Sequence, residues 1–126
     1  MPSISEKYTP TDVFKFESGA EALFSRSNIV LLAGQAFIVG TVLGQIAVSG
    51  KYVQLAPAAA DGSQIAAGIL FSSVDSTAGD ARAVLVVRDA IAADSRVIWP
   101  AGITVNQKGL AISQLGANGV ILRTGV

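Results

Sequence analysis

Few residues of this chain could carry chemistry. The sequence has no cysteine and no histidine, which excludes a disulfide framework, a zinc site with sulfur or nitrogen ligands, and any Ser-His-Asp triad. Three carboxylates, Asp75, Asp80 and Asp89, lie near one another in sequence and offer the oxygen ligands that Ca²⁺ prefers. Their spacing matches no calcium loop, and residues 75–80 are typical of a polar turn. We therefore predict no catalytic residue, no metal site and no cofactor.

One lysine suggests an alternative function. Lys51 follows Ser49-Gly50, a turn signal between two apolar runs, so it should lie at the tip of a hairpin. Small β-barrel-like domains that carry biotin or lipoyl groups display a lysine on such a turn. The methionines or acidic residues that flank carrier lysines are missing here, and a solubilising turn lysine is the simpler interpretation. A carrier or accessory domain of an enzyme complex that displays Lys51 remains the alternative.

The composition restricts the partners. Apolar residues make up 51% of the 126 residues and charged residues only 14%, with a net charge of zero. Without a basic field, nucleic-acid binding is not expected. The apolar window 29–48 is interrupted by glycines and glutamines, so we predict no membrane span, and residues 1–10 lack a signal-peptide core. We expect a protein made in the cytoplasm whose charge-poor surface is partly covered by a partner or by its own copies.

The centre of the core should be a pair of strands at residues 64–71 and 83–87. The second run, AVLVV, is aliphatic throughout, which favours a strand buried on both faces. Valines restrict χ1 in a helix and so favour a strand over a helix. The polar segment 72–82 should connect the two strands. We therefore take this pair as the element on which the remaining chain packs.

The other elements should also be mainly strands. A helix is expected near 104–115, because Thr104 and Gln107 have the spacing of a capping box and Gly116 or Gly119 can end it. Val105, Ile112 and Leu115 should form its narrow buried face. Residues 91–94 should be a connection. Further strands are predicted at 28–32, 36–39, 41–43, 45–48, 52–55, 96–99 and 120–123.

The first 27 residues differ from the rest in composition. They hold seven of the eighteen charges and four of the eight aromatic residues. Tyr8, Phe14 and Phe16 share one parity, which suggests an extended segment with one apolar face. Either it is a first strand paired within its own domain, or it is an arm that adds a strand to a partner's sheet. We predict an arm at 1–27 and a β-rich domain at 28–126.

An ordered set of motifs carries a resemblance to a known family. Together these motifs resemble the head-decoration proteins of lambda-like tailed bacteriophages. They are residues 41–44 (TVLG), 50–52 (GKY), 60–64 (ADGSQ), 67–70 (AGIL), 83–88 (AVLVVR), 99–104 (WPAGIT) and 119–123 (GVILR).

The resemblance implies a structural protein and not an enzyme. Members of that family form homotrimers at threefold positions on the outer surface of the expanded capsid, where they bind the major capsid protein and cement the shell against the pressure of packaged DNA. It implies a compact, mainly β domain of the β-clip or β-tulip type, located in the virion, with an N-terminal segment that becomes ordered on the shell. The expected capsid-binding residues are Ile4, Tyr8, Val13, Phe14 and Phe16. Trp99, Pro100 and Ile103 are the expected subunit contacts.

Overall fold

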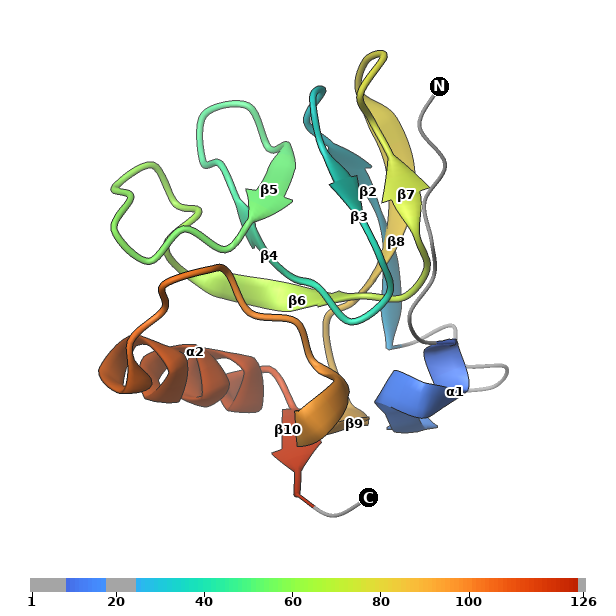
Figure 1. Cartoon of the computed structure of the whole chain (residues 1–126), viewed down its shortest axis with the longest axis vertical. Helices are drawn as coiled ribbons and strands as arrows, with labels where there is room; N and C mark the ends of the chain where they lie inside the picture. Colours follow the sequence, from blue (N-terminus) through green and yellow to red (C-terminus); the bar gives the residue numbers. More distant parts are fainter. Residues whose placement is uncertain (1–8, 18–24, 125–126) are drawn as a thin grey trace.

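Five strands of the chain close into a small β-barrel. The computed structural model describes residues 9–17 and 25–124, and the barrel order is β2-β5-β4-β6-β8 (Figure 1). The predicted central pair is present, because β6 and β8 are antiparallel neighbours. The barrel strands are β2 (Arg26–Leu31), β4 (Val42–Gln45), β5 (Tyr52–Gln54), β6 (Ala66–Leu70) and β8 (Ala81–Val86).

The barrel is held most firmly on one side. Strand β8 pairs with β2 along six residues, whereas the closing pair between β2 and β5 is the single contact of Leu31 with Tyr52. Strands β4 and β5 form a hairpin around the predicted turn at Ser49-Gly50, although its first strand lies at 42–45 and not at 45–48, and Gly50 takes φ 74°. That value lies in the left-handed region, which glycine enters without a Cβ penalty. The seam at β2–β5 therefore leaves one end of the barrel open.

The central strands bury both faces. Leu43, Leu70 and Leu85 point into the barrel, while their neighbours Val42, Ile69 and Val86 point outward into a second core. This alternation explains why the sequence shows an aliphatic run without polar residues at 83–87. The prediction of a strand buried on both faces is confirmed at Leu85 and Val86, which are fully buried.

A second, three-stranded sheet and a helix cover the outer side of the barrel. The sheet has the order β1-β9-β10, with β1 (Phe14–Glu17) antiparallel and β10 (Val120–Arg123) parallel to β9 (Ala90–Ala93). Helix α2 (Val105–Ala117) connects β9 to β10 and lies along β6 (Figure 1). The second core fills the space between the barrel, this sheet and α2.

Helix α2 begins as its sequence predicts. Thr104 Oγ1 accepts a hydrogen bond from Gln107 N at 3.1 Å, and Gln107 Oε1 accepts one from Thr104 N at 3.0 Å. This reciprocal pair is a capping box. Gln114 Oε1 accepts a hydrogen bond from Ala66 N at 2.8 Å and so ties the helix to the start of β6. The helix gives way at Gly119, which has φ 88°.

The remaining elements are short. Strands β3 (Ala36–Phe37) and β7 (Val74–Asp75) form a two-stranded ribbon. Helix α1 (Pro10–Val13) precedes β1, and the 3-10 helix η2 (Asp94–Arg96) follows β9. The prediction of a mainly β domain with one substantial helix is thus confirmed.

Several local predictions are wrong. Of the strand predicted at 45–48, only Gln45 lies in a strand, because β4 ends there and residues 47–49 form a turn. Residues 96–99 do not form a strand, because η2 includes Arg96 and only Ile98 makes an isolated bridge to Thr41. The expected connection at 91–94 is instead largely strand β9, whose alanines are buried and so remain in a strand despite their weak strand propensity. In α2, Ala111 and Leu115 are the buried residues, whereas Val105 is 87% exposed.

Candidate functional site

The start of the described chain is built into the domain. Val13 and Phe14 are buried in the second core, with exposed fractions of 0% and 7%. The ring of Phe14 stacks on that of Phe71, with centroids 5.8 Å apart, and the Arg26 guanidinium lies 3.6 Å from the centroid of the Phe71 ring. Stacked aromatic and cation–π contacts add to the gain from burial. The residues just after the N-terminal segment therefore stabilise the fold.

A charge-assisted clamp fixes the other end of β1. Arg26 donates from Nε to Glu17 Oε2 at 3.0 Å and from Nη2 to Glu17 Oε1 at 2.9 Å. Ser25 Oγ also donates to Glu17 Oε2, at 2.7 Å. The hydrogen bonds from Arg26 to the Glu17 carboxylate raise the pKa of the Arg26 guanidinium. Such a bidentate pair fixes geometry as well as charge, so the end of β1 is held against the start of β2.

The prediction of an extended arm is wrong for residues 10–17, because they form α1 and β1 of the domain itself. The structure instead contains the other possibility, a first strand paired within its own domain. Val13 and Phe14, two of the five expected capsid-binding residues, face the core and are not available to a partner. Ile4 and Tyr8 lie outside the described residues. A candidate arm is thus limited to residues 1–8, which enter the domain at Thr9.

The entry point of that segment is defined by hydrogen bonds. Thr9 N donates to Asp12 Oδ2 at 2.9 Å, and Asp12 N donates to Thr9 O at 3.0 Å. The hydrogen bond from the Thr9 backbone lowers the pKa of the Asp12 carboxyl. These contacts start α1 at Pro10, and α1 in turn packs against β9 and η2. Residues 1–8 therefore join the domain beside the three-stranded sheet.

The outward face of the three-stranded sheet carries a row of apolar side chains. Phe16 and Ile121 both pair with Ile91 of the central strand, one from each side. Phe16 is 55% exposed, Ile121 is 44% exposed and Ile91 is half-buried. Phe16 is an expected capsid-binding residue. The sequence does not single out Ile91, which lies in the predicted connection 91–94, or Ile121, whose strand has no predicted partner. Only the pairing of strands distant in sequence brings the three together.

The expected subunit contacts lie at the edge of the second core. Trp99, Pro100 and Ile103 are all half-buried, and Trp99 and Ile103 pack against the second core. Lys108 Nζ lies 5.4 Å from the centroid of the Trp99 ring. Within the described residues, the buried Trp99 Nε1 has no hydrogen-bond partner. These residues clearly contribute to the fold, and their role between subunits stays a prediction.

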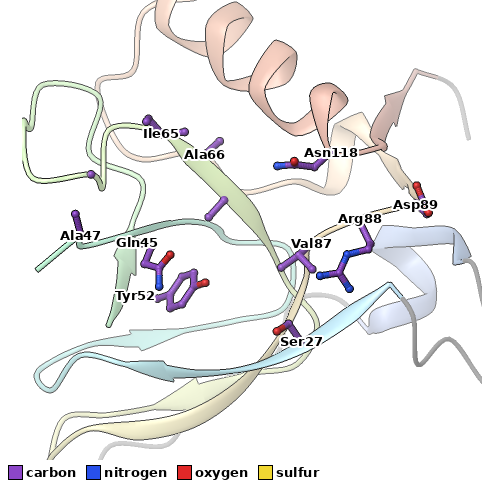
Figure 2. Close-up of a pocket in the computed structure, with 12 residues that line it drawn as sticks. Ser27, Gln45, Ala47, Tyr52, Ile65, Ala66, Val87, Arg88, Asp89 and Asn118 are labelled. Carbon is purple, nitrogen blue, oxygen red and sulfur yellow. The ribbon is translucent and has the colours of Figure 1, made fainter. Parts of the chain in front are cut away.

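The open end of the barrel forms a hollow of about 670 Å³. Figure 2 shows Tyr52 and Gln45 on one side of it and Val87 and Arg88 on the other. Burial raises the pKa of the Tyr52 phenol, whose ring covers the barrel interior. Mouths of barrels often bind ligands. Here the wall is a mixture of small, polar and apolar side chains, and this mixture does not indicate a particular class of ligand.

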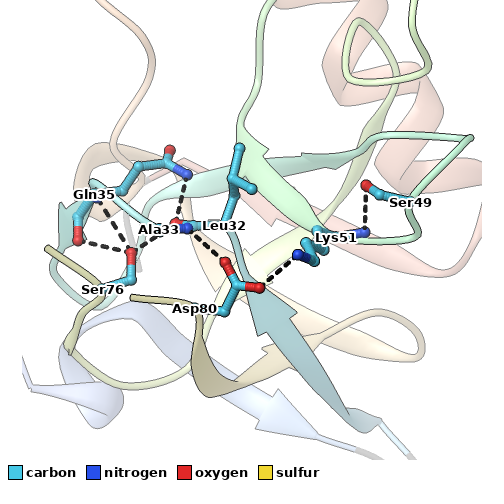
Figure 3. A network of polar contacts seen from close by, with 7 residues as sticks. All are labelled: Leu32, Ala33, Gln35, Ser49, Lys51, Ser76 and Asp80. Carbon is cyan, nitrogen blue, oxygen red and sulfur yellow. Dashed lines mark hydrogen bonds and ion pairs between the residues drawn. The ribbon is translucent and has the colours of Figure 1, made fainter. Parts of the chain in front are cut away.

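Lys51 is held in a polar network and is not displayed alone. Its ammonium forms an ion pair with Asp80 Oδ2 at 2.5 Å, and Asp80 Oδ1 accepts a hydrogen bond from Ala33 N at 2.9 Å (Figure 3). The contact with Lys51 is the main cause that lowers the pKa of the Asp80 carboxyl. Beside it, Ser76 Oγ donates to Leu32 O at 2.7 Å. This arrangement makes Lys51 a structural residue and weakens the carrier alternative.

The three carboxylates singled out in the sequence do not converge. Asp75 Oδ1 accepts a hydrogen bond from Thr77 Oγ1 at 2.6 Å, which lowers the pKa of Asp75, and Asp80 faces Lys51. Asp89 follows β8 with φ 47° and packs close to Gly119. Among residues 9–17 and 25–124, no group of three metal-ligating side chains is close enough to hold an ion. The same ranges contain no helix of the length and hydrophobicity that a membrane span requires.

Comparison with known proteins gives one clear result. The sequence profile described as bacteriophage lambda head decoration protein D matches residues 3–120. That family consists of structural proteins of the phage head and is not a family of enzymes. A search of curated proteins finds no match. Because the profile covers nearly the whole chain, the protein belongs to the bacteriophage lambda head decoration protein D family and associates with a phage capsid.

Proposed function

We propose that the protein is a trimeric cement that binds the outer face of the expanded phage head at threefold positions and stabilises it against the pressure of packaged DNA. The observation that carries this proposal is the family match over residues 3–120. The partner is the major capsid protein of the phage. We also propose that residues 1–8, with Ile4 and Tyr8 as anchors, form the arm that grips the shell.

The composition supports extensive contact with other chains. Only 14% of the residues are charged, and large apolar side chains such as Phe16 and Ile121 are 55% and 44% exposed. Monomeric proteins rarely leave contiguous apolar surface uncovered, and the centres of subunit interfaces are depleted of charge. A protein whose copies touch each other and a shell would cover such surface in the assembled particle.

The architecture supports a tethered arm. Residues 1–8 join a domain whose first described element is fixed by the Thr9–Asp12 hydrogen bonds and by the burial of Val13 and Phe14. A short segment that begins at such an anchor can add a strand to a partner's sheet, with main-chain hydrogen bonds supplying affinity. Three arms on one trimer would bind at high effective concentration. By mass action, a ligand that binds only the expanded shell favours that state.

The test is co-sedimentation of the purified protein with expanded and with unexpanded shells of its own phage. We expect saturable pelleting only with expanded shells, at three copies per threefold position. A variant that lacks residues 2–8 should remain folded, because it keeps Thr9 and all of α1, yet it should no longer pellet. A full-length variant with Ile4→Ser and Tyr8→Ser controls for the deletion and should show the same loss.

Two results would each refute a different part of the proposal. Pelleting of the truncated protein at the level of the full chain would refute the arm and leave the decoration role intact. Failure of the full chain to pellet with expanded shells would refute the cement function itself. Sedimentation equilibrium of the free protein checks the trimer independently of shell binding.

A further inference from the structure

The three-stranded sheet has two faces of different character. Its inner face, with Ala92, Val120 and Phe14, is buried in the second core. Its outer face carries Phe16, Ile91 and Ile121 in one line across all three strands. Cross-strand neighbours in register lie about 5 Å apart, so these side chains form one continuous strip. We call Phe16, Ile91 and Ile121 the apolar row.

The apolar row is not needed to close the domain. Phe16 and Ile121 keep 55% and 44% of their surface exposed although the inner face of the same strands is fully packed. The pairing of β1 with β9 is irregular between Phe14 and Phe16, and this irregularity turns the two rings to opposite faces of the sheet. Bulges of this kind redirect a side chain and recur at functional surfaces. The row is thus apolar surface that the fold leaves available.

The small size of the row restricts what can cover it. A stable interface between subunits buries about 800 Å² on each partner, which a strip of three partly covered side chains cannot supply by itself. The exposed neighbours of the row include Lys15 on β1 and Arg123, two residues after Ile121 on the same face. Carboxylates lie nearby as well, because Asp12 is close enough to Lys15 for their charges to interact and Asp94 follows β9. The charges around the row are therefore mixed, and its small size favours an apolar contact that acts together with other contacts.

The position of the row identifies that partner. Helix α1, where residues 1–8 enter the domain, packs against β9, the strand that carries Ile91. A shell protein that holds residues 1–8 is therefore brought next to the same sheet. A contact too small to bind alone gains strength when an arm and two further subunits already hold the protein in place.

We propose that the apolar row is a second shell contact, in which Phe16, Ile91 and Ile121 pack on an apolar patch of the major capsid protein. This inference rests on the cement function and adds a body contact to the arm. The row sets the orientation of the domain on the shell, while the arm provides the attachment. Affinity should therefore depend on both residues 1–8 and the sheet face.

Single lysine substitutions of the full-length protein test the inference. Phe16→Lys and Ile121→Lys place a charge in the row at positions that are already exposed, so both should fold. Val48→Lys and Val105→Lys are matched controls on the β4–β5 hairpin and at the start of α2, where the side chains are even more exposed. Binding to expanded shells is measured by co-sedimentation at several protein concentrations, with thermal unfolding and sedimentation equilibrium as checks.

We expect Phe16→Lys and Ile121→Lys to weaken binding about tenfold or more, the effect of losing one well-packed anchor, while the controls bind like the unmodified protein. Normal binding of both row variants would overturn the inference and leave the cement function standing. If the row variants lose the trimer and the control variants keep it, the inference would also be overturned, because the apolar row would then contact a second copy of the chain. Failure of the unmodified protein to bind would refute the cement function, a separate result.

Discussion

Phe14 and Phe16 are two residues apart in one short strand, yet the structure assigns them opposite roles. Phe14 is 7% exposed and stacks on Phe71, whereas Phe16 is 55% exposed. Replacing Phe14 with alanine removes a buried ring and leaves a cavity beside Phe71. Substitutions of this kind cost about 3–5 kcal/mol of unfolding free energy, a large part of the roughly 5–15 kcal/mol that stabilises a domain. Phe16→Ala should change stability by less than about 0.5 kcal/mol.

The assay is urea unfolding followed by the fluorescence of Trp99, the only tryptophan, which packs against the second core. We expect Phe14→Ala to lower the midpoint strongly at an unchanged m-value, and to lower the melting temperature by roughly 10–20 °C. Phe16→Ala should overlay the unmodified protein. A loss below about 1 kcal/mol for Phe14→Ala, or equal losses for the two variants, would refute the placement of β1 in the core.

Two further predictions concern the fold. First, a Cβ on Gly68 would lie 2.5 Å from Val86 O, whereas one on Gly109 would meet no atom within 4 Å. In urea unfolding, Gly68→Ala should therefore lower the free energy of unfolding by about 1–3 kcal/mol. Gly109→Ala, inside α2, should raise it by about 0.5–1 kcal/mol. A change of the same sign in both variants would contradict the packing. Second, hydrogen bonds from Ser63, Thr77 and Lys51 lower the pKa values of Asp61, Asp75 and Asp80 below 3.8. The stability that these three carboxylates contribute is present above pH 3.8 and is lost as the pH falls through their lowered pKa values. The melting temperature should therefore drop below about pH 4. The drop should be less steep in Asp80→Asn, because its amide cannot be protonated in this range. A flat profile from pH 5 to 2.5 would exclude these contacts as a source of stability.

Much of the fold follows from local signals in the sequence. The aliphatic run at 83–87 indicates a doubly buried strand, and the structure shows that the neighbours Leu85 and Val86 fill two different cores. The spacing of Thr104 and Gln107 placed the start of α2, and Ser49-Gly50 placed the β4–β5 hairpin. These signals succeed because each depends on residues a few positions apart. Their geometry does not require knowledge of distant partners.

The failures depend on distant partners. Strand β9 contains three alanines and lacks the branched and aromatic residues that indicate a strand. It is a strand because it lies between β1 and β10, where its small residues pack into the second core. The parity of Phe14 and Phe16 suggested one apolar face, which is correct for a regular strand. The irregular pairing with Ala92 and Ile91 breaks that parity. The candidate shell contact at Ile91 and Ile121 was invisible for the same reason, since the row exists only after the three strands pair.

The irregularity in β1 also explains how one short segment can serve both the domain and a partner. With regular pairing, Phe14 and Phe16 would lie on the same face of the sheet. Both rings would then be buried in the core, or both would be exposed at the surface. One extra residue on β1 resolves this conflict, because Phe14 still packs on Phe71 while Phe16 joins Ile91 outside. The Glu17–Arg26 clamp then fixes the strand beyond the irregularity. The boundary between the fold and its proposed shell contact therefore runs through β1 itself, so that loss of β1 pairing would remove the core anchor and the surface contact together.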